Sequence, residues 1–82
     1  MDIDNLQHMA NRIGTFFESM PDATEARREI ALHLRKFWEP RMRRQLLADL
    51  DATGSPGLLP IVREAVVAHR ATLEPLPAPT SR

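Results

Sequence analysis

The sequence predicts a small all-α domain: a bundle of four helices, or of three helices and one short helical segment, with a proline-rich extended C-terminal tail. Apolar residues recur at helical spacing in four successive segments, and no segment shows the alternation that is typical of a β-strand. Proline or glycine interrupts the pattern between these segments, where helices are expected to end. Residues 1–73 are therefore expected to form a single helical domain and residues 74–82 the tail.

The first helix is predicted from Ile3 to Ser19, where the amphipathic pattern is clearest. Its apolar face carries Ile3, Leu6, Met9, Ala10, Ile13, Phe16, Phe17 and Met20. Gly14 lies near the edge of this face. Glycine costs about 1 kcal/mol relative to alanine within a helix, but it permits another backbone to approach closely. Tight packing is expected at this position.

The second helix is predicted to end at about Trp38. Pro21 breaks the first helix, and Asp22 followed by Glu25 has the pattern of a capping box, which starts the second. Leu32 lies off the apolar face and is a candidate contact point. That face carries Ala23, Ala26, Ile30, His33, Leu34 and Phe37, with Trp38 at its border.

Pro40 is expected to form a corner, because proline disfavours helical angles in the preceding residue but suits the first turn of a new helix. The third helix is predicted from Arg41 to about Ala52 and is stopped by the Gly- and Pro-containing segment 53–57. Arg43 projects onto the apolar face of this helix. Its guanidinium must reach solvent or meet a carboxylate or carbonyl group, since an unpaired buried charge is costly. Arg43 is thus a candidate for a structural or interfacial ion pair.

The fourth helix is predicted to contain Pro60 in its first turn and to continue to about Leu73, with Val67 on the face opposite its apolar stripe. Three prolines from Pro75 onward forbid regular structure in the tail, which is expected to be extended. The predicted core consists of Leu6, Ile13, Phe17, Ile30, Leu34, Phe37, Leu46, Leu50 and Val62.

Length and composition restrict the function. A domain of 82 residues has little stability to spare, so a partner or self-association would help it. The chain has no cysteine and therefore no thiolate ligand for zinc or an iron–sulfur cluster. Its apolar runs are too short to span a bilayer, and its acidic N-terminus lacks the pattern of a secretory signal. These features predict a cytoplasmic protein that does not insert into a membrane.

Positive charge is concentrated in one region, although the formal net charge is zero. From Arg27 to Arg44 there are seven basic residues against Glu29 and Glu39. The corner is expected to place aromatic side chains on one side and arginines on the other. Because Trp and Arg are enriched in interface hot spots, this region is a candidate partner interface. Its predicted residues are Trp38, Arg41, Arg43, Arg44, Arg35 and Lys36.

No catalytic, cofactor-binding or metal-ligating group emerges from the sequence. The three histidines are too widely spaced for a local metal motif, and the glycines form neither a phosphate loop nor a dinucleotide fingerprint. His33 and His69 are interpreted as packed or hydrogen-bonded residues. The arginine-rich corner has three interpretations: a solvated face with local salt bridges, a nucleic-acid patch and a protein-docking surface. The carboxylates available for local salt bridges are Glu29, Glu39, Asp49 and Asp51. A chain without net charge argues against nucleic acid, and docking is favoured.

Three stretches resemble the delta subunit of soluble NAD-dependent formate dehydrogenases. The first is Ala10-Asn11-Arg12-Ile13-Gly14 with the following Phe16-Phe17. The second runs from Ile30 to Arg44 and contains the most specific part, Lys36-Phe37-Trp38-Glu39-Pro40-Arg41-Met42-Arg43-Arg44. The third is Leu59-Pro60-Ile61-Val62-Arg63-Glu64-Ala65. The resemblance spans about Leu6 to Ala68 and leaves out the tail.

This resemblance implies a non-catalytic accessory subunit. Enzymes of that family oxidise formate at a molybdenum or tungsten centre held by a bis-pterin guanine dinucleotide cofactor in the large alpha subunit, and electrons pass through iron–sulfur clusters to FMN and NAD. The delta subunit looks like a component without a redox cofactor that supports maturation or stability. Phe37, Trp38, Arg41, Arg43 and Arg44 are accordingly expected to help dock the large subunit, with Phe37 more a core residue than an interface residue. The alternatives are direct contact of the arginines with cofactor phosphates, a nucleic-acid-binding module and a generic protein-interaction module.

Overall fold

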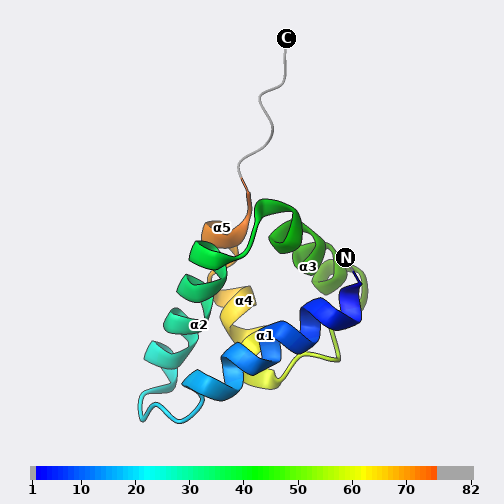
Figure 1. Ribbon diagram of the computed structural model, residues 1–82. Helices are drawn as coiled ribbons and strands as arrows, with labels where there is room; N and C mark the ends of the chain where they lie inside the picture. The colour runs from blue at the N-terminus through cyan, green and yellow to red at the C-terminus, as the bar shows by residue number, and fades with distance from the viewer. Residues whose placement is uncertain (1, 76–82) are drawn as a thin grey trace.

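The computed structural model describes residues 2–75, which contain helices and no strand (Figure 1). The helices are α1 (Ile3–Phe17), α2 (Ala23–Phe37), α3 (Pro40–Thr53), α4 (Pro60–Ala68) and α5 (Arg70–Leu73). The predicted all-α class is confirmed, and the first three helices lie close to their predicted bounds. No helix among the described residues has the length and apolar character needed to cross a membrane. Of the predicted tail, residues 76–82 lie outside the described residues.

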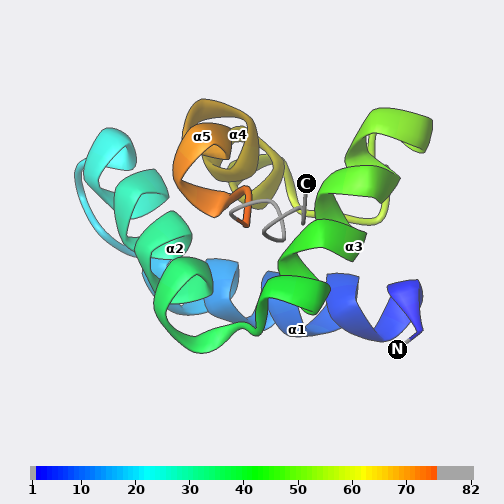
Figure 2. The ribbon, with the colours of Figure 1, turned by 90° about the horizontal axis from the view of Figure 1, so that it is seen from above.

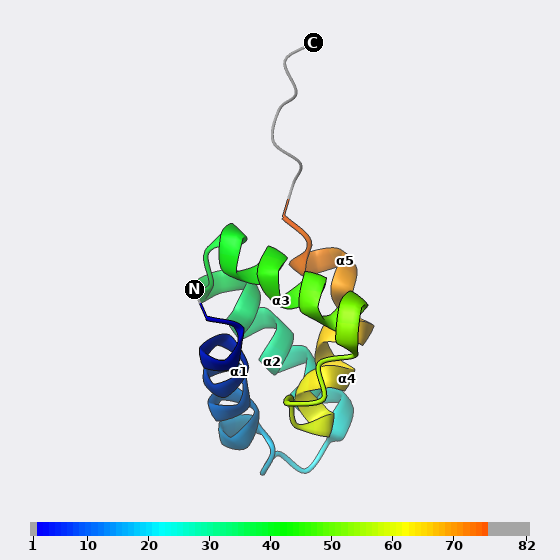
Figure 3. The same cartoon turned by 90° about the vertical axis from the view of Figure 1, so that its right-hand side faces the viewer.

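Helix α4 packs against both α1 and α2, and α1 also contacts α2 and α3. Seen from above, α2 and α3 lie on opposite sides of α4 and α5, with α1 along the lower edge of the picture (Figure 2). When the right-hand side of Figure 1 faces the viewer, α3 crosses the upper part of the bundle, above α1 and α4 (Figure 3). This arrangement brings the end of α2, the start of α3 and α5 to the same end of the molecule.

Local chemistry explains where α2 begins. The side chain of Asp22 accepts hydrogen bonds from the backbone N–H groups of Thr24 at 2.9 Å and Glu25 at 3.4 Å. These bonds satisfy donors that the first helical turn leaves unpaired. The carboxylate of Glu25 binds Arg28 at 2.7 Å. The predicted N-cap is therefore confirmed, whereas the structure gives Glu25 a different partner from the one that a full capping box requires.

The ends of α3 also follow from its sequence. Trp38 and Glu39 have extended backbone angles, and Pro40 occupies the first turn of α3. The predicted corner at Pro40 is thus confirmed. At the other end Gly54 has a φ of 78°, in the left-handed region that glycine adopts without the steric cost other residues carry. Its backbone N–H donates to the carbonyl oxygen of Leu50 at 2.9 Å, which closes the helix.

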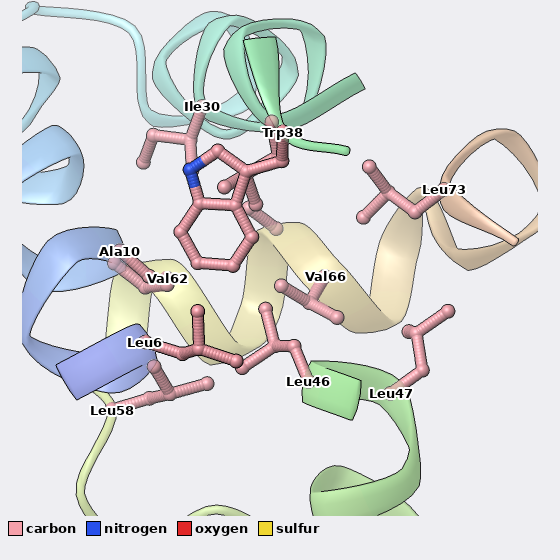
Figure 4. Close-up of a cluster of buried hydrophobic side chains, with 12 residues drawn as sticks. Leu6, Ala10, Ile30, Trp38, Leu46, Leu47, Leu58, Val62, Val66 and Leu73 are labelled. Carbon is pink, nitrogen blue, oxygen red and sulfur yellow. The ribbon is translucent and has the colours of Figure 1, made fainter. Parts of the chain in front are cut away.

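The core lies between α1, α2, α3 and α4 (Figure 4). Its buried members are Leu6, Ala10, Ile30, Leu34, Trp38, Leu46, Leu47, Leu58, Val62, Ala65, Val66 and Leu73. Of the predicted core residues, five are fully buried: Leu6, Ile30, Leu34, Leu46 and Val62. Three others, Ile13, Phe17 and Leu50, are partly buried and pack against the cluster.

The prediction that Phe37 is a core residue is wrong, because 70% of its surface is exposed. Trp38 occupies the core instead and is only 5% exposed. Helical periodicity applies only while the chain remains helical, and α2 ends at Phe37. The extended backbone of Trp38 turns its indole inward, toward Val62 and Val66 of α4 (Figure 4).

The predicted fourth helix is not continuous. It is interrupted at His69, whose φ of −114° and ψ of 25° are not helical, and α5 follows as a single turn. Leu73 is 2% exposed and joins the core. Arg70 forms two hydrogen bonds of 2.7 Å with the carboxylate of Asp51 in α3 and a third, of 2.8 Å, with Glu74. The change of direction at His69 therefore ties the last turn to the core and to α3.

Gly14 confirms the predicted tight packing, although its neighbour is a side chain rather than a backbone. A Cβ atom at this position would collide with Cγ2 of Val62. It would also lie 3.7 Å from Cγ2 of Ile61 and 3.8 Å from Cδ1 of Leu59. The missing side chain of Gly14 therefore allows α4 to lie directly against α1.

We expect Gly14→Ala to lower the free energy of unfolding by about 1 kcal/mol. Overpacking against Val62 costs about 1–3 kcal/mol, and the higher helix propensity of alanine recovers about 1 kcal/mol of it. Urea unfolding followed by far-UV circular dichroism measures this change. In a Val62→Ala background the colliding methyl group is absent, so the same substitution should stabilise the protein. Stabilisation in both backgrounds would contradict the close approach of α4 to α1.

We also expect the Asp51–Arg70 pair to make stability depend on pH. The hydrogen bond from Arg70 lowers the pKa of the Asp51 carboxyl below its ordinary value of 3.8. A depressed folded-state pKa contributes stability that is fully present above the ordinary pKa and is lost as the pH falls through the folded-state value. The wild type should therefore exceed Asp51→Asn in melting temperature near neutral pH, and the difference should shrink below about pH 4.

The matched control is Arg70→Gln, which removes the partner. In that background Asp51→Asn should change the melting temperature little at any pH. A difference between wild type and Asp51→Asn that stays constant down to about pH 2 would show that the pair does not produce the pH dependence.

Candidate functional site

The candidate interface is the corner between α2 and α3, and the structure divides its six predicted residues into two groups. Two side chains are buried: Trp38 and Arg43, the latter 7% exposed. Four are exposed: Arg35, Lys36, Arg41 and Arg44. We call these four residues the cationic corner. Trp38 and Arg43 act within the chain in this structure, and the interface role of the cationic corner stays a prediction.

Arg43 joins three segments. Its Nε donates to the carbonyl oxygen of Trp38 at 3.4 Å, and its Nη1 donates to that of Leu73 at 3.0 Å. Burial lowers the pKa of the Arg43 guanidinium, and the positive charges of Arg35 and Arg44 lower it further. The guanidinium meets carbonyl groups, one of the two kinds of partner that the sequence predicts. Within residues 2–75 it forms no structural ion pair, and an interfacial ion pair stays a prediction.

The prediction that the corner gathers its aromatic residues on one side is wrong. Trp38 turns into the core, whereas Phe37, the last residue of α2, lies on the surface. The two rings are adjacent in sequence but belong to different environments. The exposed part of the corner is therefore cationic, and its tryptophan serves the packing of the bundle.

The side chains of the cationic corner form no ion pair within the described part of the chain, although Glu39 and Glu74 lie near them. None of its four side chains forms a hydrogen bond or ion pair with another residue of 2–75. Asp51 is bound to Arg70, and Asp49 accepts hydrogen bonds from Gln7 at 2.9 Å and Ser55 at 2.7 Å. A solvated face neutralised by local salt bridges is therefore not what the structure shows.

A depression of about 460 Å³ opens between the corner and α5. Arg35 and Arg43 line it, together with the Glu74–Pro75 segment. A guanidinium has five N–H donors, and within residues 2–75 Arg43 bonds to carbonyl groups through Nε and Nη1. This part of the surface can therefore receive a carboxylate or another oxyanion by charge-assisted hydrogen bonds. Within residues 2–75 no group of three or more His, Asp or Glu side chains is placed to hold a metal ion.

Sequence reasoning missed a second surface, formed by four rings on α1 and α2. The ring centroids of Phe16 and Phe17 lie 4.9 Å apart, those of Phe17 and His33 6.3 Å, and those of His33 and Phe37 4.7 Å. We call this set the aromatic row. All four residues were assigned to the apolar faces of their helices. The pair Phe16-Phe17 contained the missed signal, because consecutive helical residues point about 100° apart and only one of them can face the core directly.

Comparison with known protein families identifies a family that matches most of the chain. The family model of the NADH-dependent formate dehydrogenase delta subunit FdsD matches residues 5–66 of this chain. The matched range contains the cationic corner and the aromatic row, and it ends before α5. No curated protein and no solved structure gives a significant match. The family match confirms the resemblance to the delta subunit that the sequence shows.

We expect Arg43→Met to lower the free energy of unfolding by about 1–3 kcal/mol, since it leaves two carbonyl groups without their charged donor. Methionine keeps an apolar stem, so the change reports mainly the lost hydrogen bonds. The control is Arg41→Met on the same helix, which should change stability by no more than about 0.5 kcal/mol because Arg41 is exposed. Urea titration of both variants measures the difference. Equal effects would mean that Arg43 does not hold the corner together.

Proposed function

Because this chain belongs to the family of NADH-dependent formate dehydrogenase delta subunits, FdsD, we propose that it is a non-catalytic accessory subunit. Membership of this family means that the chain associates with a formate dehydrogenase complex. In the proposed role it supports the assembly, stability or cofactor maturation of the large alpha subunit. The family match carries this proposal, and the shape and charge of the corner support it.

The redox cofactors of the complex are assigned to its other subunits in this proposal. The molybdenum or tungsten centre with its bis-pterin cofactor, the iron–sulfur clusters, FMN and NAD all lie outside this chain. The absence of cysteine from the sequence supports this assignment for the clusters, whose usual ligands are cysteine thiolates. What this chain supplies is a surface for binding.

The cationic corner is the proposed contact with the large subunit. Arg35 and Lys36 lie at the end of α2, and Arg41 and Arg44 lie in the first turns of α3. Because these side chains have no carboxylate partner within residues 2–75, they are available to carboxylates of another subunit. A single exposed ion pair contributes only about 0–1 kcal/mol. The proposal therefore relies on several such contacts acting together on a corner that Arg43 and Trp38 hold in place.

Charge reversal tests the corner. Tagged wild type and the variant Arg41→Glu/Arg44→Glu are recovered from cells that express the other formate dehydrogenase subunits, and formate-dependent NAD reduction and metal content are measured in the same samples. We expect wild type to retain the large subunit and the variant to lose most of it, because four units of charge change at the contact. Circular dichroism should show both proteins folded, since both positions are exposed.

The matched control is Arg27→Glu/Arg28→Glu, which changes the net charge equally in the first half of α2. If the control and the corner variant retain the large subunit to the same extent as wild type, the corner is not part of the contact. A wild type that retains no subunit would overturn the accessory-subunit role as a stable association. Salt-dependent binding of duplex DNA by wild type, lost in the corner variant, would favour the nucleic-acid alternative.

A further inference from the structure

The aromatic row is the largest departure from the expected distribution of apolar side chains in this domain. Its two end members, Phe16 and Phe37, are 75% and 70% exposed. Between them Phe17 and His33 complete a continuous series of ring contacts from α1 to α2. Single exposed apolar residues are common on protein surfaces, but a contiguous exposed group indicates a binding site.

The row is not an incomplete part of the core. The core closes without Phe16 and Phe37, because Trp38 takes the position that the helical pattern had assigned to Phe37. Phe17 packs against the core from its edge and gives the row a fixed base. Phe16 meets Phe17 edge to face, with an angle of 86° between their planes. Such contacts stabilise aromatic pairs, so Phe16 has a packing partner within the domain.

Cations border the row. Arg12 precedes Phe16 by four residues and Lys36 follows His33 by three, so each lies beside the row on its own helix surface. Within residues 2–75 neither side chain forms an ion pair. The acidic residue at the same helical spacing is Glu29, four residues before His33. At Phe37 the row adjoins Lys36 and hence the cationic corner.

We propose that the aromatic row is a docking surface for another subunit of the formate dehydrogenase complex, and that the segment it receives is apolar at its centre and carries carboxylates at its margin. This inference rests on the proposed function and adds a second contact to it. The rings supply apolar area, from which most of the affinity of an interface comes, while the cationic corner supplies orientation. The row meets the cationic corner where Phe37 follows Lys36 at the end of α2.

The charges favour a different chain over a second copy of this one. In a two-fold symmetric dimer built on the row, each copy would present the same surface to the other. Arg12 and Lys36 would then face a partner that is cationic in the same places. Like charges brought together at an interface oppose association. A partner with carboxylates around an apolar centre removes this conflict.

The test replaces the exposed ends of the row. Tagged Phe16→Glu/Phe37→Glu is expressed with the other dehydrogenase subunits and recovered, and the retained subunits are quantified against wild type. The control is Ala52→Glu/Val67→Glu, which places the same charges at exposed apolar positions outside the row. We expect the row variant to lose retention by roughly tenfold or more, as hot-spot residues do, and the control to retain the complex.

Each outcome decides between the alternatives. Equal retention by the row variant and the control, with wild type bound, overturns the docking role of the row and leaves the accessory function intact. Failure of wild type to bind any subunit rejects the proposed function and this inference with it. If circular dichroism shows the row variant unfolded, Phe16→Gln/Phe37→Gln replaces it under the same criteria. If isolated wild type is a dimer by light scattering, the row variant is monomeric and complex retention is unchanged, the occupant is a second copy and the proposal is wrong.

Discussion

The guanidinium of Arg43 holds together the three segments on which the candidate interface depends. It binds carbonyl oxygens at the end of α2 and at the end of α5, while its own backbone belongs to α3. A buried charge is costly unless it is well hydrogen-bonded. The last carbonyl groups of a helix have no partner within the helix and carry its partial negative charge. Arg43 therefore satisfies two groups that the fold leaves unpaired, and these groups in turn stabilise its charge.

This interaction has consequences for the surface. Arg43 and Trp38 are turned inward, and the remaining cations of the corner lie on the surface. Two carboxylates of α3 are already bound, Asp51 by Arg70 and Asp49 by Gln7 and Ser55. These interactions stabilise the bundle, and within residues 2–75 the cationic corner forms no ion pair. A neighbouring row of aromatic rings adds apolar area, and the two features together have the composition of an interface.

The family match and the structure concern overlapping but different parts of the chain. The match covers residues 5–66, which include the corner and the row. Leu73, which supplies a carbonyl to Arg43 and a side chain to the core, lies beyond that range. The proposed binding surface is therefore supported from the interior by Leu73, which lies outside the matched region. A small domain of this kind gains stability from every such connection, because its core alone is limited.

The sequence by itself determined the all-α class, the first three helices and most of the core, since these depend on apolar spacing and on residues such as Asp22, Pro40 and Gly54 that act on their immediate neighbours. It also determined the family, through the motif around Trp38. Only the tertiary structure decided that Trp38 rather than Phe37 is buried, because helical periodicity stops where the helix ends. The tertiary structure also decided three further features: the break at His69, the carbonyl partners of Arg43 and the contact between rings of α1 and α2. Each depends on which distant segments pack together, and the spacing of residues within one helix does not contain that information.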